Sequence, residues 1–237
     1  MEATMKKYKL TNETRVHLGR TLYRIEALKD FGDVKSGDKG GFVQSEQNLS
    51  HQGNAWIYGD AEVYDNACVY DDARIYDKAR VRDNAKVFDH AVVDGKVDIY
   101  ENAKVCAQSS IYGEVEVSGD AVICGKAEVY DSAWVYDNAI VGGNAEVCCG
   151  VRIFGRAEIV GNALIESNRD FIVFKNWWNN DNGLYFTWTR SNNMWMTGCF
   201  YGTGEQLIKE AYAQGKEAGK EYKRVIRYVE SILADNS

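Results

Sequence analysis

The sequence predicts a mainly β protein, a solenoid in which a short strand and a corner repeat every six residues. Small residues recur at every sixth position from Ala55 to Ala163, and Val or Ile recurs at every sixth position from Ile57 to Ile165. Nineteen hexads follow one another without an insertion. Alternate residues of a strand face the same side, so both series are expected to point inward. A fixed short period of this kind determines the architecture of a repeat protein.

Each hexad supplies one strand and one corner. The β-branched residue fills the core and favours extended backbone, and the small residue leaves room near the corner. The next two positions are rich in Asp, Asn and Gly, such as Asp65 and Asn66, which tolerate turn and left-handed conformations. We therefore expect the Val and Ile series to be buried and the Asp and Gly positions to form corners.

The hexads DAEVYD, NACVYD, SAWVYD and NAEVCC resemble those of the left-handed parallel β-helix of the transferase-hexapeptide superfamily. In that family three hexads form one triangular coil of about 18 residues, so the resemblance implies about six coils over residues 54–166. The same prism serves acyltransferases, binding proteins and scaffolds, so the fold alone does not define the function.

Residues 1–53 are expected to form an N-terminal cap on the first coil. The segment LYRIEALKDF supplies Leu22, Ile25 and Leu28, and the segment GDVKSGDKGGF is rich in turn residues. A solenoid needs caps because an open end exposes apolar core and unpaired strand groups. The stretch from Leu22 to Ala61 also resembles the amino-terminal segment of hexapeptide-repeat proteins common in phages and prophages.

Residues 167–237 are expected to form a small C-terminal β-β-β-α module. Thr203 and Gln206 fit a capping box that opens a helical region. Gly215 and Gly219 weaken its middle, so either one bent helix or two helices are expected. The segments GLYFTWTR and MWMTGCFYGT resemble the tail module of the same phage-type proteins. The sequence pattern predicts strands at 171–174, 184–188 and 194–196, with turns at 179–183 and 191–193.

The three histidines are poorly placed for catalysis. The family resemblance implies a His general base near a trimer interface and a loop over the acyl donor. His17 lies in the cap, His51 at the start of the first coil and His90 at a corner where other coils carry Asn, Asp or Lys. No loop interrupts residues 54–166. We therefore expect no catalytic residue and no cofactor.

The cysteines and the absence of targeting signals favour a reduced, cytoplasmic protein. Six cysteines are scattered along the chain, and the adjacent Cys148 and Cys149 lack the CxxC spacing of a zinc or redox site. We expect structural thiols and no metal ligands. The sequence contains no signal peptide and no apolar run long enough to span a membrane, so no membrane association is expected. The expected location is the cytoplasm of a bacterial host.

The repeat region is acidic. Residues 54–166 carry twenty acidic and ten basic side chains. A negative prism is a poor generic binder of the DNA backbone, although it could attract a basic protein. The alternative is that Asp is simply a good corner residue.

A ladder of arginines and tyrosines is the candidate ligand site. Residues 18 apart are expected on adjacent coils, which makes Tyr64, Arg82 and Tyr100 consecutive rungs. Guanidinium groups beside aromatic rings suit a phosphate and a base, as in a nucleotide-like ligand. The alternative is a ladder that only stabilises the fold. The candidate ligand-binding residues are Tyr64, Arg74, Tyr76, Arg80, Arg82 and Tyr100.

Part of the third face is smooth and apolar. We expect protein to cover it, because monomers rarely expose such patches. The cover is either a neighbouring subunit or the helix containing Val225, Ile226 and Val229, and the family resemblance implies a homotrimer. The interface residues are Val122, Cys124, Ile140 and Val160.

The favoured function is a non-enzymatic binding or interaction protein of phage or prophage type. It would act in counter-defence, either by sequestering a nucleotide-like ligand or by blocking a host defence protein. One alternative is an acyltransferase that uses acyl-coenzyme A, as the family resemblance implies. The other is a structural part of a virion or scaffold.

Overall fold

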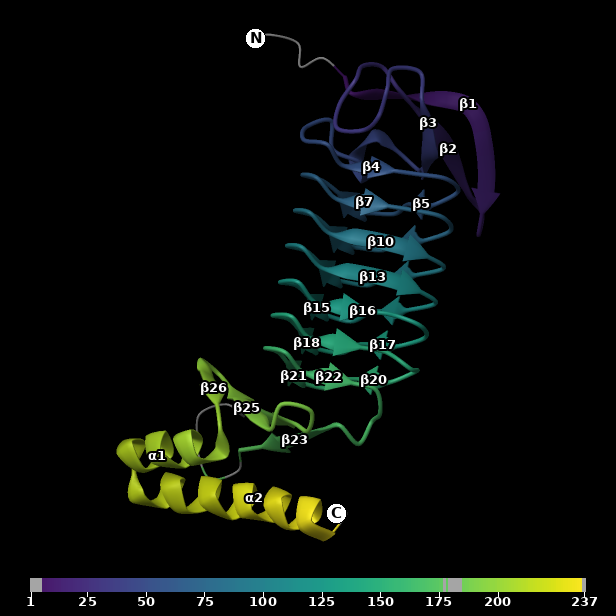
Figure 1. Cartoon of the computed structure of the whole chain (residues 1–237). Coiled ribbons are helices and arrows are strands. Elements are labelled where there is room, and N and C mark those ends of the chain that lie inside the picture. Colours follow the sequence, from purple (N-terminus) through teal and green to yellow (C-terminus); the bar gives the residue numbers. More distant parts are fainter. Residues whose placement is uncertain (1–5, 177, 179–184, 236–237) are drawn as a thin grey trace.

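The computed structural model describes residues 6–176, 178 and 185–235, and these form a parallel β-solenoid with a β cap and a small α+β module at its two ends (Figure 1). Strands three hexads apart pair in parallel, as Val63 does with Val81 and Val69 with Val87. This spacing confirms the coil of 18 residues. The first face has seven strands, so the solenoid makes about seven turns where the repeats alone predicted about six.

The solenoid has three faces built from short strands. The first face contains β4 (Trp56–Ile57), β7 (Arg74–Ile75), β10 (Val92–Gly95), β13 (Ser110–Gly113), β16 (Glu128–Val129), β19 (Glu146–Val147) and β22 (Leu164–Ile165). The second face contains β5 (Glu62–Val63), β8 (Arg80–Val81), β11 (Asp98–Ile99), β14 (Glu116–Val117), β17 (Trp134–Val135) and β20 (Arg152–Ile153). The third face contains β6 (Cys68–Val69), β9 (Lys86–Val87), β12 (Lys104–Val105), β15 (Val122–Ile123), β18 (Ile140–Val141) and β21 (Glu158–Ile159).

The two repeated series form the core, as predicted. Every Val and Ile from Ile57 to Ile165 and every small residue from Ala55 to Ala163 is almost fully buried. They form one continuous apolar cluster along the axis of the solenoid. Each coil therefore buries its core against its two neighbours, as repeat architectures require.

The corners depend on one position in each hexad. That position has a positive φ at every corner from Gly59 to Gly161, with values between 56° and 94°. Gly and Asp occupy most of these positions because they tolerate the left-handed region. Several corner carboxylates also accept a backbone N–H from the next coil; Asp89 accepts that of Ala107 at 3.0 Å. The acidity of the solenoid is thus partly a requirement of its corners.

The cap continues the second face. β1 (Tyr8–His17) and β2 (Arg20–Ala27) form an antiparallel hairpin, and β3 (Lys39–Val43) pairs antiparallel with β2 and parallel with β5. The parallel pairing therefore begins before residue 54. A short 3-10 helix, η1 (Glu46–Asn48), follows β3. Of the predicted cap residues, Leu22 and Ile25 are buried and Leu28 is exposed.

The C-terminal module is an antiparallel sheet covered by two helices. The predicted strands are present as β23 (Phe171–Lys175), β24 (Tyr185–Thr189) and β25 (Met194–Thr197), and the sequence pattern missed β26 (Phe200–Gly202). Thr203 caps α1 (Gly204–Gln214) through the predicted capping box, and α1 ends at Gly215 before α2 (Lys216–Asp235). The turn at 191–193 is confirmed, and the turn predicted at 179–183 lies outside the described residues.

The module docks on the last coil through edge hydrogen bonds. The N–H of Glu158 donates to Thr187 Oγ1 at 3.0 Å, and the N–H of Leu164 donates to Ser191 Oγ at 2.8 Å. These contacts satisfy strand groups that an open end would leave unpaired. Among the described residues, no helix is long and apolar enough to cross a membrane.

Candidate ligand-binding cleft

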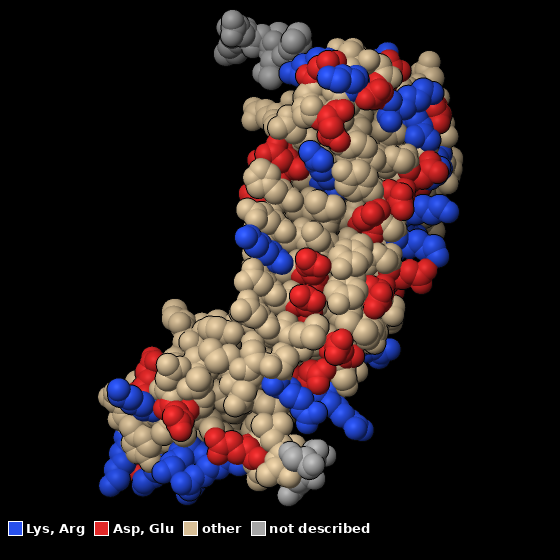
Figure 2. Space-filling model, in the orientation of Figure 1, with Lys and Arg blue, Asp and Glu red and all other residues tan. Residues whose placement is uncertain are grey.

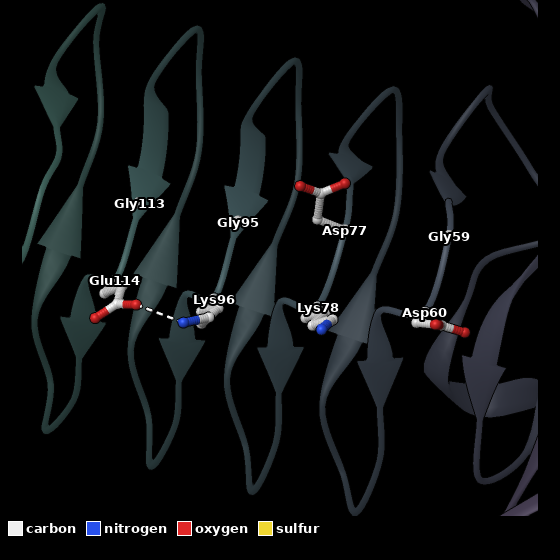
Figure 3. A pocket seen from close by; sticks show the side chains of 8 residues that line it. All are labelled: Gly59, Asp60, Asp77, Lys78, Gly95, Lys96, Gly113 and Glu114. Atoms are coloured by element: carbon white, nitrogen blue, oxygen red, sulfur yellow. Dashed lines mark hydrogen bonds and ion pairs between the residues drawn. The ribbon is translucent and has the colours of Figure 1, made fainter.

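A cleft begins between β1 of the cap and the corner that joins the first face to the second, and it continues beyond β1 along the open row of corner residues. Figure 3 shows the row of corner residues along its length, with the Asp77 side chain standing apart from that row. One part, of about 460 Å³, is lined by Arg15, His17, Asp60, Glu62, Lys78, Arg80 and Lys96. The second part, of about 560 Å³, is lined by Gly59, Asp60, Asp77, Lys78, Gly95, Lys96, Gly113 and Glu114. The two parts share Asp60, Lys78 and Lys96 and so form one groove.

Lysines occupy equivalent corner positions on adjacent coils. Lys78 and Lys96 are 18 residues apart, and the Lys78 N–H donates to the Gly95 carbonyl at 3.0 Å. Lys96 Nζ lies 2.6 Å from Glu114 Oε1, a contact drawn in Figure 3. Within the described residues Lys78 makes no ion pair. One ammonium group is therefore available to an anion in the groove.

Gly95 and Gly113 are part of the groove lining. A Cβ on Gly95 would lie 2.6 Å from the Gly113 carbonyl oxygen, closer than real Cβ contacts allow. Both glycines also have a φ above 90°, which side chains rarely adopt. The close stacking of adjacent coils therefore requires glycine at both positions.

The carboxylates at the cap end of the same rows, Asp60 and Glu62, form ion pairs with cap residues. Glu62 is buried, and its Oε1 lies 3.0 Å from Arg15 Nη1 while its Oε2 lies 3.2 Å from His17 Nδ1. Asp60 Oδ1 lies 2.9 Å from Arg15 Nη2 and 3.2 Å from Arg24 Nη2. Burial alone would raise the pKa of Asp60, but the two guanidinium groups outweigh it and keep that pKa below its usual value. These acidic groups are therefore already neutralised by arginines.

The predicted arginine–tyrosine ladder is brought together only in part. Tyr64 is about 1 % exposed, because it packs under the cap against Leu22 and Phe42, and burial raises its pKa. Arg82 lies over the Tyr100 ring at 4.0 Å. A phosphate would have to compete with the carboxylates that already bind Arg82, namely Asp98 at 3.1 Å and Asp83 at 3.0 Å.

The other three predicted ligand residues lie in two places. Arg80 lines the cleft, and Asp98 is its ion-pair partner at 3.9 Å. Arg74 lies 3.6 Å from Asp33 on the first face. Beside it Tyr76 stacks on Tyr58, with ring centroids 4.4 Å apart. Arg80 is thus the one predicted residue that lines the groove.

Two of the three histidines serve the fold or face solvent. His51 stacks on Tyr8 at 4.4 Å, and its Nδ1 accepts the N–H of Lys7 at 3.2 Å. His90 is exposed and lies 3.5 Å from Asp72. His17 is the histidine that lines the cleft, but its Nε2 is enclosed and has no hydrogen-bond partner among the described residues.

The predicted interface residues form a half-buried apolar strip on the third face. Val122 and Ile140 pair in parallel there, and Cys124 and Val160 are also half-buried. The residues Val225, Ile226 and Val229 of α2 are buried in the module's own core, against Phe186, Trp188 and Trp195. A neighbouring subunit on this strip stays a prediction.

The sequence contained one signal for the cleft that periodicity did not reveal. Lys78 and Lys96 replace, at one corner, the amides that another corner carries at Asn66, Asn84 and Asn102. The position of β1 had no such signal, because it depends on contacts between residues some 45 positions apart, as between Arg15 and Asp60.

Figure 2 shows basic side chains gathered over the cap and over the helical end, with acidic ones along the solenoid.

Comparison with known proteins gives one limited match. No family model matches the sequence. The uncharacterized acetyltransferase YdcK of Escherichia coli (strain K12) is 37% identical over 62 residues, which cover 23% of this chain and 19% of that protein. The chain thus matches about a fifth of that relative's length. The solenoid and this match are together consistent with a hexapeptide-repeat β-helix.

Proposed function

We propose that this chain is a non-enzymatic binding protein that holds a small anionic ligand in the cleft between β1 and the solenoid corner. The observation that carries the proposal is the exposed Lys78, which has no ion pair with any described residue and lies beside Arg80 and Lys96 within one groove. Asp60 and Glu62 lie one coil before Lys78 and Arg80 on the same side of the groove, where cap residues already form ion pairs with both carboxylates.

The ligand is proposed by its charge and size. Ammonium groups bind phosphate or carboxylate as point charges, and Arg80 adds planar donors that suit the same groups. The two parts of the groove fall within the usual 300–1,000 Å³ of small-molecule sites. A nucleotide-like ligand fits this reasoning through its phosphates. Stacking of a base is less favoured, because the Tyr64 ring is buried and the Tyr100 ring is covered by Arg82.

Titration calorimetry with inorganic phosphate, pyrophosphate and nucleoside mono- and diphosphates tests the proposal. We expect Lys78→Ala and Arg80→Ala each to weaken binding about tenfold or more, the effect of a charged hydrogen bond. Lys104→Ala is the matched control, since Lys104 is an exposed lysine on the third face. Absence of binding, or binding unchanged by both cleft variants, would contradict the proposal.

Four further parts of this proposal are supported by the sequence alone. They are the phage-type origin, the counter-defence role through a sequestered ligand or a blocked host protein, the homotrimer and the cytoplasmic location. Light scattering of the purified chain tests the trimer. Purification from infected bacteria, followed by mass spectrometry of retained molecules, tests the ligand and the protein partner together.

Acyl transfer is the second candidate, and two observations favour it. The relative with a matching segment is described as an acetyltransferase. In the cleft, Glu62 Oε2 lies 3.2 Å from His17 Nδ1, near enough for the carboxylate to influence an imidazole base, although the two atoms form no hydrogen bond. The enclosed Nε2 weighs against it. Acceptor-dependent release of coenzyme A from acyl donors, abolished by His17→Gln, would favour this candidate over simple binding.

A further inference from the structure

Two adjacent cysteines and an aspartate meet at the same corner of the solenoid, on the first two coils beyond the cleft residue Gly113. Cys148 is buried, Cys149 is exposed, and their sulfur atoms are 2.7 Å apart. Asp131 lies one coil earlier at the same corner, and its Oδ2 is 3.8 Å from Cys149 Sγ. The two sulfurs and a carboxylate oxygen all lie within 4.8 Å of one another.

The backbone at Cys149 is unusual for its residue type. Its φ is +61°, in the left-handed region where this corner otherwise carries Gly or Asp. A residue with a Cβ is disfavoured there by about 1–2 kcal/mol. Backbone strain at a single position justifies asking what its side chain does.

Asp131 also differs from several other corner carboxylates. Asp89 and Glu101 accept the backbone N–H of the residue one coil further on, at 3.0 Å and 2.6 Å. Within the described residues, the Asp131 side chain makes no such bond, and its hydrogen-bond partner is the Cys149 thiol. It also has no ion pair with a Lys or Arg of the described chain. The carboxylate is therefore directed at the thiols.

We propose that Cys148, Cys149 and Asp131 bind a divalent cation of the zinc and cadmium class. Two thiolates and one carboxylate are ligands that this class accepts, whereas magnesium and calcium prefer oxygen alone. Tetrahedral coordination at about 2.3 Å from each sulfur needs the sulfurs about 3.8 Å apart. The sulfurs must therefore separate by about 1 Å, which rotation of the exposed Cys149 side chain supplies. Water completes the coordination.

Cadmium titration of the full, phosphine-reduced chain tests the proposal through the ultraviolet thiolate-to-cadmium charge-transfer absorption. We expect one ion to bind per chain, with the band lost in Cys149→Gly. That variant removes the thiol while relieving the positive φ, so a failure to fold is not its expected effect. Asp131→Asn should weaken binding at least tenfold. Competition with a colorimetric zinc chelator should rank the variants in the same order for zinc.

Two control variants keep the test specific. Cys199→Ser removes an exposed thiol in the C-terminal module, and Cys106→Ser removes a half-buried thiol on the third face. Both are expected to bind cadmium as the unmodified chain does. A band that survives Cys149→Gly, a band that disappears in Cys106→Ser, or no band at all would overturn the proposal. Because the cleft residues are unchanged in these variants, the result is independent of the proposed anion binding.

Discussion

Replacement of Val87 by Asp tests the inward-facing series most directly. Val87 lies in β9, is fully buried, and pairs with Val69 and Val105 on the neighbouring coils. Replacement by Ala would remove two methyl groups, at about 0.8 kcal/mol each, and the cavity left behind raises the loss to about 2–3 kcal/mol. Replacement by Asp adds a buried, unpaired carboxylate, which costs several kcal/mol more. The sum approaches the entire stability of a typical domain, about 5–15 kcal/mol.

Urea unfolding followed by circular dichroism measures the stability of Val87→Asp and of its control. The matched control is Lys86→Asp, because Lys86 is the other residue of the same two-residue strand and is exposed. We expect Lys86→Asp to change stability by less than about 1 kcal/mol, as surface substitutions usually do. A soluble Val87→Asp variant that unfolds cooperatively within about 1 kcal/mol of the unmodified chain would refute the burial argument.

Three further predictions concern the cap and the third face. Burial lowers the pKa of Lys7 to about 8, so unfolding takes up a proton and stability should rise between about pH 8 and pH 10.5, by at most about 3 kcal/mol. Lys7→Met should abolish this rise, as measured by urea unfolding at several pH values. Above pH 10 the stability of both proteins should fall, because burial raises the pKa of Tyr8 in the folded state and the unfolded phenol therefore loses its proton first. Gly40→Ala should cost about 2 kcal/mol or more in thermal unfolding, because its Cβ would lie 2.6 Å from the Ile57 carbonyl oxygen; an unchanged melting temperature would contradict this. Ile140→Lys should dissociate an oligomer formed through the third face, and light scattering that shows no change in mass would count against that interface.

Periodicity predicted the core because the surroundings of a core residue repeat with the coil. Val87 meets Val69 and Val105, and Val105 in turn meets Val87 and Ile123, so one hexad contains the packing rule for all of them. The corner positions followed from the same rule, since each needs a residue that tolerates positive φ. Because each coil contacts only its neighbours, the local sequence pattern predicts the fold of the whole solenoid.

The candidate site could not be derived in this way. Tyr64 matched the ladder by spacing, but the cap covers it through Leu22 and Phe42, and no period links these residues. Arg82 also matched by spacing. Its ion-pair partner Asp98, however, lies 16 positions away on the adjacent strand, whereas the predicted ladder included only residues 18 apart. Contacts between the cap hairpin and the corner are non-local, so the cleft became visible only in three dimensions.

The corner lysines provide a test that separates a binding role from a structural one. At the second corner of the coil, Asn66, Asn84 and Asn102 are joined by side-chain hydrogen bonds of 3.2 Å, which stabilise adjacent coils. At the cleft corner, Lys78 and Lys96 take the equivalent positions, where like charges on neighbouring rungs repel each other.

If Lys78 serves only the fold, replacement by Asn should lower the melting temperature and leave phosphate binding unchanged. If it serves a ligand, as we propose, Lys78→Asn should raise the melting temperature at low salt, because the repulsion with Lys96 is removed, and should weaken phosphate binding at the same time. The gain in stability should shrink as salt screens the two charges. Melting curves at two salt concentrations, paired with calorimetry, measure both effects. A variant that loses stability and keeps its affinity for phosphate would show that the lysine belongs to the scaffold.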